Sequence, residues 1–417
     1  MSSLRALAAN RDFTTLWVGE TVSALGSRMS MFVFPLLAYS LSGSAITAAL
    51  VEGSHLLGLV AALLPAGALA DRVDRRRLMI GASAAGMVLY GSLALAGALG
   101  RLTVVHLAVV GLLAGVAAGV FGPAQMSAIR SVVTTEQLPA ALSQNEAREH
   151  VAGLLGGPLG GALYGAVRWL PFAVDTLTYA VSCLMLSRLR TDLSPAPAGT
   201  RPRRRLRAEV AEGLRFVVAR PLFRVLIATS AAFNLVVNAL FFVVLLRMVQ
   251  AGAHPVEIGL VSTAAGVGGV LGALVAPCLV ARVPTGRLTV LIGWSLTLPV
   301  VPLIWWATPA AAGAALFTLL LLNPAGNAGI GAYRIAVTPA DLQGRVESAS
   351  QVAGMVAIPL APLVGGLLLT GLGGGGATAV LAGATAIVAL MTTLSRSVRS
   401  VPRPAEWVTA DTPAHAS

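Results

Sequence analysis

The sequence predicts an all-α membrane protein in which twelve transmembrane helices form two six-helix bundles that repeat each other. Three observations support this fold: the composition, a series of long apolar runs, and an internal repeat. Of the 417 residues, 56% are hydrophobic and 11% are charged, and the mean hydropathy is +0.82. Because a water-soluble protein needs more polar surface than this, the composition places the chain among membrane proteins.

Apolar runs that can cross a bilayer follow one another along the chain, since each crossing takes roughly 20 mainly apolar residues. The runs span residues 13–39, 45–70, 78–100, 103–125, 144–167, 169–188, 222–249, 256–281, 287–307, 310–331, 347–370 and 375–395. Backbone amides in lipid must be paired within their own segment, so we expect helices here. The 45 glycines and 23 prolines fit this interpretation, because membrane helices use them for close packing and kinks.

A weak internal repeat relates the two halves of the chain at an offset of 210 residues, which falls to 204 later in the sequence. The matching pairs are Phe13 with Phe223, Leu16 with Leu226, Arg77 with Arg287, Arg130 with Arg334, Pro158 with Pro362 and Gly161 with Gly365. Parallel repeats are typical of transporters whose two bundles meet at a central cavity. The repeat predicts bundles at 1–190 and 221–396, a basic linker with a short amphipathic helix at 191–220, and a tail at 397–417.

The basic residues are distributed unevenly among the loops, and all 29 of them are arginines. With the N-terminus in the cytoplasm, 25 of them, including Arg130 and Arg148, lie on the cytoplasmic side. The positive-inside rule therefore predicts that both termini are cytoplasmic. We interpret the net charge of +12 as a topology signal and a contact for anionic lipid headgroups, not as a nucleic-acid surface, because the basic runs lie between apolar helices.

The segment Gly67–Arg77, GALADRVDRRR, lies between the second and third apolar runs. It resembles the loop-2/3 signature of the major facilitator superfamily, G-x-L-a-D-R-x-G-R-R-x. The matching residues are Gly67, Leu69, Asp71, Arg72, Arg75 and Arg76, whereas Asp74 stands where glycine is usual. A generic basic cytoplasmic loop is the alternative interpretation. The resemblance implies a gate in which Asp71 pairs with Arg75 or Arg130 when the cytoplasmic side is closed.

Other segments resemble one branch of that superfamily, which includes the enterobactin-type siderophore exporters and the macrolide-efflux proteins. These segments are Leu41–Ala45, Phe121–Ala124, Glu136–Ala140, Glu212–Phe216 and Arg220–Arg224. Members of the branch commonly carry an aspartate near the middle of helix one, where this chain has Gly26-Ser27-Arg28. The resemblance to the superfamily as a whole covers about residues 10–395.

A second motif lies in the run at 144–167. Drug–proton antiporters of the superfamily carry G-x8-G-x3-G-P-x2-G-G on helix five. The matching residues are Gly153, Gly157, Pro158 and Gly161, and the departures are Gln144 and Ala162. Glycines let a helix approach its neighbour closely, and an internal proline bends it. The motif favours efflux over uptake, with generic glycine packing as the alternative.

Ionisable residues inside apolar runs are costly and are therefore functional candidates. They are Glu20 and Arg28 in the first run, Glu52 and His55 in the second, Asp175 in the sixth and Arg247 in the seventh. Glu20, Glu52, His55 and Asp175 are candidates for carrying a coupling proton. An ion pair at the gate is the alternative for Glu20, and packing within the scaffold is the alternative for Asp175 and His55.

Two asparagine pairs with a spacing of four residues form polar stripes on the seventh and tenth runs. The resemblance implies that helices one, four, seven and ten line the substrate cavity. The predicted cavity residues are Glu20, Arg28, Asn234, Asn238, Asn323 and Asn327. The asparagines suit hydrogen bonding to an uncharged or zwitterionic substrate, and hydrogen bonding between helices is an equally good alternative.

Catalytic chemistry is not indicated, because the sequence has no His/Cys cluster with metal spacing and no nucleotide-binding P-loop, and Cys183 and Cys278 lie in apolar runs. We therefore expect a monomeric secondary transporter without cofactor or metal in a bacterial plasma membrane. Its partners would be a small-molecule substrate, protons and membrane lipid. The predicted function is proton-coupled efflux of an amphipathic antibiotic, siderophore or other secondary metabolite. Nutrient uptake, and a receptor or scaffold without transport, are the alternatives.

Overall fold

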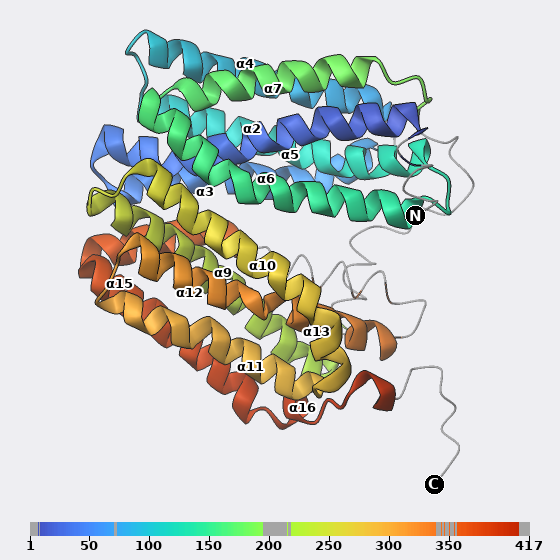
Figure 1. Cartoon of the computed structure of the whole chain (residues 1–417), viewed down its shortest axis with the longest axis vertical. Helices are drawn as coiled ribbons and strands as arrows, with labels where there is room; N and C mark the ends of the chain where they lie inside the picture. Colours follow the sequence, from blue (N-terminus) through green and yellow to red (C-terminus); the bar gives the residue numbers. More distant parts are fainter. Residues whose placement is uncertain are drawn as a thin grey trace. The chain divides into compact units, whose positions relative to one another are not determined.

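Our computed structural model describes residues 7, 9–70, 73–194, 215, 218–338, 343, 346, 350, 354 and 357–407, and this part of the chain is mainly helical. Every regular element in those residues is an α-helix or a short 3-10 helix (Figure 1). The helices group into two compact units. Unit 1 comprises Met1–Gly199 and Leu245–Thr263, and unit 2 comprises Thr200–Val244 and Ala264–Ser417.

Long helices that lie side by side make up most of unit 1. They are α2 (Arg11–Ser42), α3 (Ala45–Ala70), α4 (Arg75–Ala98), α5 (Val104–Val132), α6 (Leu138–Ala166) and α7 (Leu170–Ser187). The side chains of Asn10, Asp74 and Thr103 cap α2, α4 and α5 by accepting hydrogen bonds from backbone amides of the first turn. α3 packs on α5, α4 packs on α7, and α2 packs on both α6 and α7.

Glycines allow α3 and α5 to touch along their backbones. A Cβ atom on Gly115 would collide with the carbonyl oxygen of His55, and one on Gly58 would collide with the carbonyl oxygen of Leu112. Such close approach through small residues is how membrane helices gain packing energy without a hydrophobic driving force between them. The contact fixes His55 on α3 against α5.

An aromatic cluster joins α2, α4 and α7. The rings of Tyr90 and Tyr179 stack with centroids 5.7 Å apart, Phe172 lies 6.3 Å from Tyr90 on its other side, and Phe34 meets Tyr90 edge-on at 6.0 Å. The Tyr179 hydroxyl in turn shares a hydrogen bond of 2.9 Å with the Ser27 hydroxyl. The cluster therefore holds α7 in a fixed register against the middle of α2.

Unit 2 contains short helices together with the long helix α15. They are α11 (Thr285–Thr297), η1 (Leu298–Ile304), α12 (Pro309–Leu321), α13 (Asn323–Ala336), η2 (Ile358–Leu360), α15 (Ala361–Leu394), α16 (Arg396–Arg399) and η3 (Pro404–Glu406). α9 (Pro221–Gln250) and α10 (Pro255–Arg282) contribute to both units, because Leu245–Thr263 belongs to unit 1. α11 packs on α15, where a Cβ atom on Gly293 would lie 3.2 Å from the Ala389 side chain.

Corresponding backbone contacts in the two units support the internal repeat. In unit 1 the Arg75 amide at the start of α4 donates to the carbonyl of Leu193, beyond α7, at 3.3 Å. In unit 2 the Thr285 amide at the start of α11 donates to the carbonyl of Pro402, beyond α15, at 3.3 Å. Arg75 and Thr285 correspond at the offset of 210 residues. In both units, the returning chain satisfies an amide that a helix start leaves unpaired.

Ten helical stretches within the described residues are long and apolar enough to cross a membrane. α6, which covers the predicted run at 144–167, is not among them, and its first half carries Glu146, Arg148 and Glu149. The last two predicted runs share α15, which is interrupted at Gly373, where φ is 69°. The structure therefore confirms the all-helical membrane fold, but it does not recover twelve separate spans one by one.

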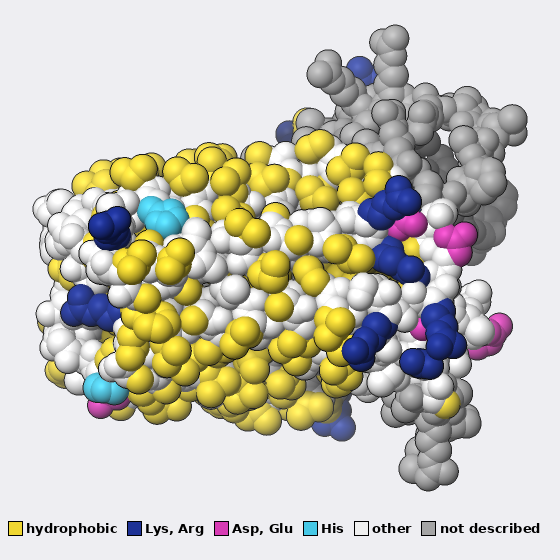
Figure 2. Space-filling model, turned by 90° about the horizontal axis from the view of Figure 1, so that it is seen from above, with side chains coloured by type: hydrophobic (Ala, Val, Ile, Leu, Met, Phe, Trp, Pro, Cys, Tyr) yellow, Lys and Arg dark blue, Asp and Glu magenta, His cyan; other side chains and the backbone are white. Residues whose placement is uncertain are grey.

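The surface of the helices is strongly apolar. Val88 and Leu95 on α4 and Leu177 on α7 are each more than 60% exposed, at 65%, 62% and 67%. Figure 2 shows one such face, on which hydrophobic side chains cover the middle and arginines lie near the ends, more of them at one end. A hydrophobic face of this extent is suited to contact with lipid chains.

Part of the predicted domain organisation falls on residues that the structure does not describe. Residues 195–214, 216–217 and 408–417 lie outside the described part of the chain, as do most residues between 339 and 356. The basic linker with its amphipathic helix, and the boundaries at 190, 220 and 396, therefore remain predictions.

Candidate functional site

Each unit contains a cavity lined by described residues of that unit. The cavity of unit 1 has a volume of about 340 Å³, and its lining residues come from all six long helices, α2 to α7. The predicted site residues among them are Glu20, Arg28 and His55. Charged groups that sequence reasoning did not select, Arg148 and Glu149, line the same cavity.

Glu20 lies on α2 and is only 4% exposed. Its carboxylate accepts a hydrogen bond of 3.2 Å from the Ser182 hydroxyl on α7, and the Ser83 hydroxyl on α4 lies 3.2 Å from that of Ser182. Arg148 on α6 interacts electrostatically with the same carboxylate. A buried carboxylate needs such partners, because burying an unpaired charge costs several kcal/mol, on the order of the desolvation penalty of one ion.

A carboxylate between two arginines lies at the side of this cavity. Glu149 Oε2 is 3.1 Å from Arg28 Nη2, and Glu149 Oε1 is 2.9 Å from Arg148 Nη2. The Arg148 side chain is only 3% exposed. Turning the Gln125 amide so that its oxygen faces Arg148 gives two further hydrogen bonds of 2.9 Å. Together with Glu20, these groups form a network of two arginines and two carboxylates in which the charges balance.

Arg148 was not selected as a site residue from the sequence, where it counted only toward the topology. Its side chain is buried beside Glu149 and Gln125. The signal was present, because Arg148 and Glu149 lie inside the predicted run at 144–167 and so belonged with the intramembrane charges.

The remaining proton-carrier candidates lie in different surroundings. His55 lines the cavity of unit 1, whereas Glu52, one helical turn away on α3, is not among the described residues that line it. Asp175 is 0% exposed, and its Oδ1 accepts a hydrogen bond of 3.0 Å from the Thr178 hydroxyl. A Cβ atom on Gly26 would lie 2.5 Å from Asp175 Oδ1, so this carboxyl sits in the contact between α2 and α7.

The glycines of the helix-five motif divide into two groups. A Cβ atom on Gly157 would lie 2.8 Å from the Gly259 carbonyl oxygen, and one on Gly161 would collide with the Pro255 carbonyl. Both partners belong to the first turns of α10, within unit 1. Gly153, by contrast, has open space where its Cβ atom would be. The motif therefore forms a tight backbone contact through two of its glycines only.

The predicted cytoplasmic gate is only partly described. Asp71 and Arg72 lie outside the described residues, and Gly67 lies in the last part of α3. At the start of α4, the Arg75 guanidinium donates to the Ser131 hydroxyl at 3.3 Å, and that of Arg76 donates to the Thr191 carbonyl at 3.0 Å. Arg130 is exposed in the last turn of α5.

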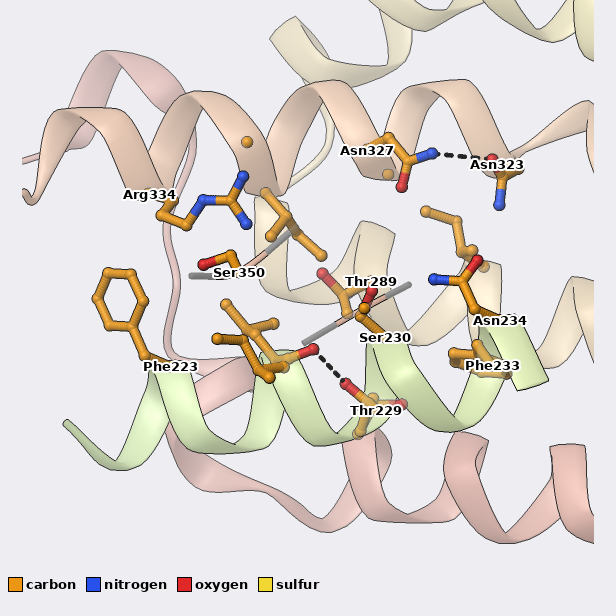
Figure 3. A pocket seen from close by; sticks show the side chains of 18 of the residues that line it. Phe223, Thr229, Ser230, Phe233, Asn234, Thr289, Asn323, Asn327, Arg334 and Ser350 are labelled. Atoms are coloured by element: carbon orange, nitrogen blue, oxygen red, sulfur yellow. Dashed lines mark hydrogen bonds between the residues drawn. The ribbon is translucent and has the colours of Figure 1, made fainter. Parts of the chain in front are cut away.

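The cavity of unit 2 is larger, about 650 Å³, and it lies among α9, α11 and α13 (Figure 3). Three of the four predicted asparagines line it: Asn234, Asn323 and Asn327. The Asn327 amide donates to Asn323 Oδ1 at 2.9 Å. Asn238 is not among the described lining residues, and its amide donates to the Asn234 carbonyl at 2.7 Å.

Comparison with known proteins identifies the family. The family model described as "Major Facilitator Superfamily" matches residues 16–331. The chain belongs to this superfamily. The match confirms the membership that the Gly67–Arg77 loop implied. By its family, the chain is a multi-pass membrane transporter.

Curated relatives of this superfamily member are efflux pumps. "Multidrug efflux pump Tap" of Mycobacterium tuberculosis is 30% identical over 275 residues, which are 63% of this chain and 64% of the relative. The pump of the same name from Mycolicibacterium fortuitum is 28% identical over 260 residues, 60% of this chain and 62% of the relative. The chain thus matches less than two thirds of the length of these relatives.

Solved structures show the same fold. A bacterial homologue of the human lysosomal transporter Spinster aligns with a TM-score of 0.73 at 14% identity, covering 94% of this chain and 97% of that one. A bacterial homologue of the iron transporter ferroportin aligns with a TM-score of 0.71 at 18% identity, covering 92% of this chain and 98% of that one. At these identities the likeness establishes the fold alone.

Proposed function

We propose that this protein is a proton-coupled exporter that moves an amphipathic small molecule out of a bacterial cell by alternating access. The observation that carries the proposal is the buried Glu20 carboxylate beside Arg148 in the cavity of unit 1. The similarity to multidrug efflux pumps supports the outward direction. The arginine distribution supports a topology with both termini in the cytoplasm. We also propose that the protein acts as a monomer in the plasma membrane.

Proton exchange at Glu20 would work through the arginine network. Arg148 is 2.9 Å from Glu149, which also binds Arg28. When Glu20 releases its proton, Arg148 can balance the new charge, while Arg28 continues to satisfy Glu149. When Glu20 is protonated, Arg148 and Arg28 share the single carboxylate of Glu149, so the network carries one net positive charge. The Arg28 side chain is 46% exposed, so water can solvate that charge.

His55 is the second candidate for the proton carrier, because it lines the same cavity as Glu20. Glu52 and Asp175 remain candidates on their chemistry alone, since neither is among the described lining residues of that cavity. The burial of Asp175 between α2 and α7 favours a structural role for it.

Asp71 is proposed to close the cytoplasmic gate, by pairing with Arg75 or Arg130 and with the exposed amides of a helix start. The Asp71→Asn variant should lose a charge-assisted contact of about 1–3 kcal/mol and so favour the inward-open state. Transport should fall while the amount of protein in the membrane stays normal. Counterflow assays on membranes with matched protein levels measure this, and unchanged transport would remove the gating role.

Export itself is tested in a drug-sensitive bacterial host. Expression of the protein should raise the minimum inhibitory concentration of at least one amphipathic antibiotic or siderophore in a panel, and cells preloaded with that compound should release it faster. A protonophore should abolish the release even when cellular ATP is maintained, because the energy comes from the proton gradient. Net accumulation of a nutrient by well-expressed protein would instead establish uptake and reject export.

A further inference from the structure

Two asparagines in the first turns of α13 form a hydrogen-bonded pair in the cavity of unit 2. The Asn327 amide nitrogen donates to Asn323 Oδ1 at 2.9 Å, and both side chains line the cavity. The two residues are four positions apart on one helix, so their side chains meet on the same face. The bond fixes how the two amides are turned with respect to each other.

This bond leaves a donor and an acceptor of the pair available to a ligand. A carboxamide has one carbonyl oxygen and one NH₂ group. The bond engages the Asn323 oxygen, so the Asn323 nitrogen and the Asn327 oxygen make no hydrogen bond with the described residues. Turning both amides over would exchange these roles and would again leave one nitrogen and one oxygen free. The pair therefore offers a donor and an acceptor side by side in either assignment.

Both free atoms face the cavity. Figure 3 shows the Asn323 nitrogen and the Asn327 oxygen turned toward α9, on which Asn234 lies. α13 packs closely on α11 at this turn, because a Cβ atom on Gly326 would collide with the end of the Ile292 side chain. The asparagine pair is thus held on the wall of a cavity of about 650 Å³, which accommodates a drug-sized molecule.

Apolar side chains line much of the same cavity. Phe233 of α9 contributes to one wall, and Ile292 and Leu296 of α11 contribute to another. A ligand that displaces water from the cavity gains apolar contacts with these walls. It also removes water from the asparagine pair, and a polar group that loses water without gaining a partner weakens binding. The ligand should therefore carry a group that pairs with both free atoms.

We propose that the cavity of unit 2 binds an amphipathic molecule that carries a lactam or a primary carboxamide. Such a group has an N–H donor and a carbonyl oxygen on one edge. Its N–H donates to the Asn327 oxygen, and its carbonyl accepts a hydrogen bond from the Asn323 nitrogen. The apolar part of the molecule lies along α9 and α11. That this molecule is also the exported substrate rests on the proposed function.

Ligands without such an edge pair with only part of the site. A lactone accepts a hydrogen bond from the Asn323 nitrogen but leaves the Asn327 oxygen unpaired. An N-methyl lactam also lacks the donor, and it places a methyl group against that oxygen. A site that hydrogen-bonds an N–H of its ligand discriminates against analogues without it, because its own polar group then stays unpaired. The cavity should therefore prefer the lactam to both analogues.

Equilibrium binding to the purified full chain tests this preference. The protein is placed in nanodiscs of zwitterionic lipid, and 5-hexylpyrrolidin-2-one, its N-methyl derivative and γ-decalactone are titrated by calorimetry, with empty nanodiscs as the blank. These compounds share a ring size and a hexyl chain and carry no charge, so they differ in the group that meets the asparagines. We expect the lactam to bind about fivefold more tightly than either analogue, as one added hydrogen bond provides. Equal binding of the three compounds, or no binding of the lactam, overturns the proposal.

Variants assign the preference to the asparagine pair. The double variant Asn323→Ala/Asn327→Ala removes both free atoms, so the lactam should lose its advantage over the two analogues. Asn238→Ala is the matched control and should keep the preference, because Asn238 is not among the described lining residues and its amide binds the Asn234 carbonyl at 2.7 Å. A preference that persists in the double variant, with helix content unchanged by circular dichroism, overturns the assignment. If the double variant does not fold, the ranking by the parent protein decides the proposal.

These binding experiments separate the inference from the proposed function, because they use neither a proton gradient nor transport. A lactam preference that depends on the asparagine pair supports the inference even if the protein does not export. Export of compounds from cells, combined with equal binding of the three compounds in nanodiscs, would reject the inference and leave the export function in place.

Discussion

Replacing Glu20 by glutamine is expected to abolish uphill transport while substrate exchange across the membrane continues. Glutamine keeps the size of the side chain and can still accept a hydrogen bond from Ser182, which lies 3.2 Å from the carboxylate. Glutamine cannot release a proton, so the side chain at this position stays uncharged, as in protonated Glu20. Substrate-induced proton release from purified protein at weakly buffered pH should disappear, and counterflow should remain.

Glu52→Gln is the matched comparison for this experiment, because it removes a second carboxyl within the membrane that is not among the described lining residues of the cavity. It should release protons as the parent protein does. If Glu20→Gln also releases protons normally, Glu20 is not the carrier. If proton release is lost only in Glu52→Gln, Glu52 on α3 is the proton carrier.

The glycine contact between α6 and the start of α10 predicts the second large effect. A methyl group on Gly161 would collide with the Pro255 carbonyl, and one on Gly157 would lie 2.8 Å from the Gly259 carbonyl oxygen. Backbone atoms cannot move aside as a flexible side chain can, so the helices must separate. We expect Gly157→Ala and Gly161→Ala each to reduce export at least tenfold.

Gly153→Ala is the internal control, because a Cβ atom there meets open space. It belongs to the same motif and the same helix, and alanine favours helix more than glycine does, so export should be unchanged. Efflux of a preloaded fluorescent compound, normalised to the amount of protein in the membrane, measures all three variants. A similar loss in all three would mean that the motif acts through helix properties and not through this contact.

Local patterns in the sequence predicted the features that depend on local chemistry. The apolar runs placed the helices, as the predicted run at 45–70 and α3 (Ala45–Ala70) illustrate. The order of glycine, aspartate and arginine in Gly67–Arg77 identified the superfamily, which the match over residues 16–331 confirms. Both signals are contained in short segments and need no tertiary information.

Features that depend on neighbouring helices were beyond such patterns. Arg148 lies next to Glu149 on α6, and its burial also depends on groups from other helices, Gln125 on α5 and Glu20 on α2. Asn238 has the right spacing for the polar stripe of Asn234, yet its amide binds the backbone of its own helix. The spacing shows which residues share a face but not how far a cavity extends along it.

Proton antiport in reconstituted vesicles tests the central claim most directly. The purified protein is placed in liposomes with the compound that gives the largest resistance in the panel, and a pH gradient is imposed without other energy sources. We predict that the compound accumulates inside vesicles with an acidic interior, that a protonophore releases it, and that vesicles with Glu20→Gln do not accumulate it. Accumulation only with an acidic exterior, or the same accumulation in Glu20→Gln vesicles, would contradict proton-coupled export through Glu20.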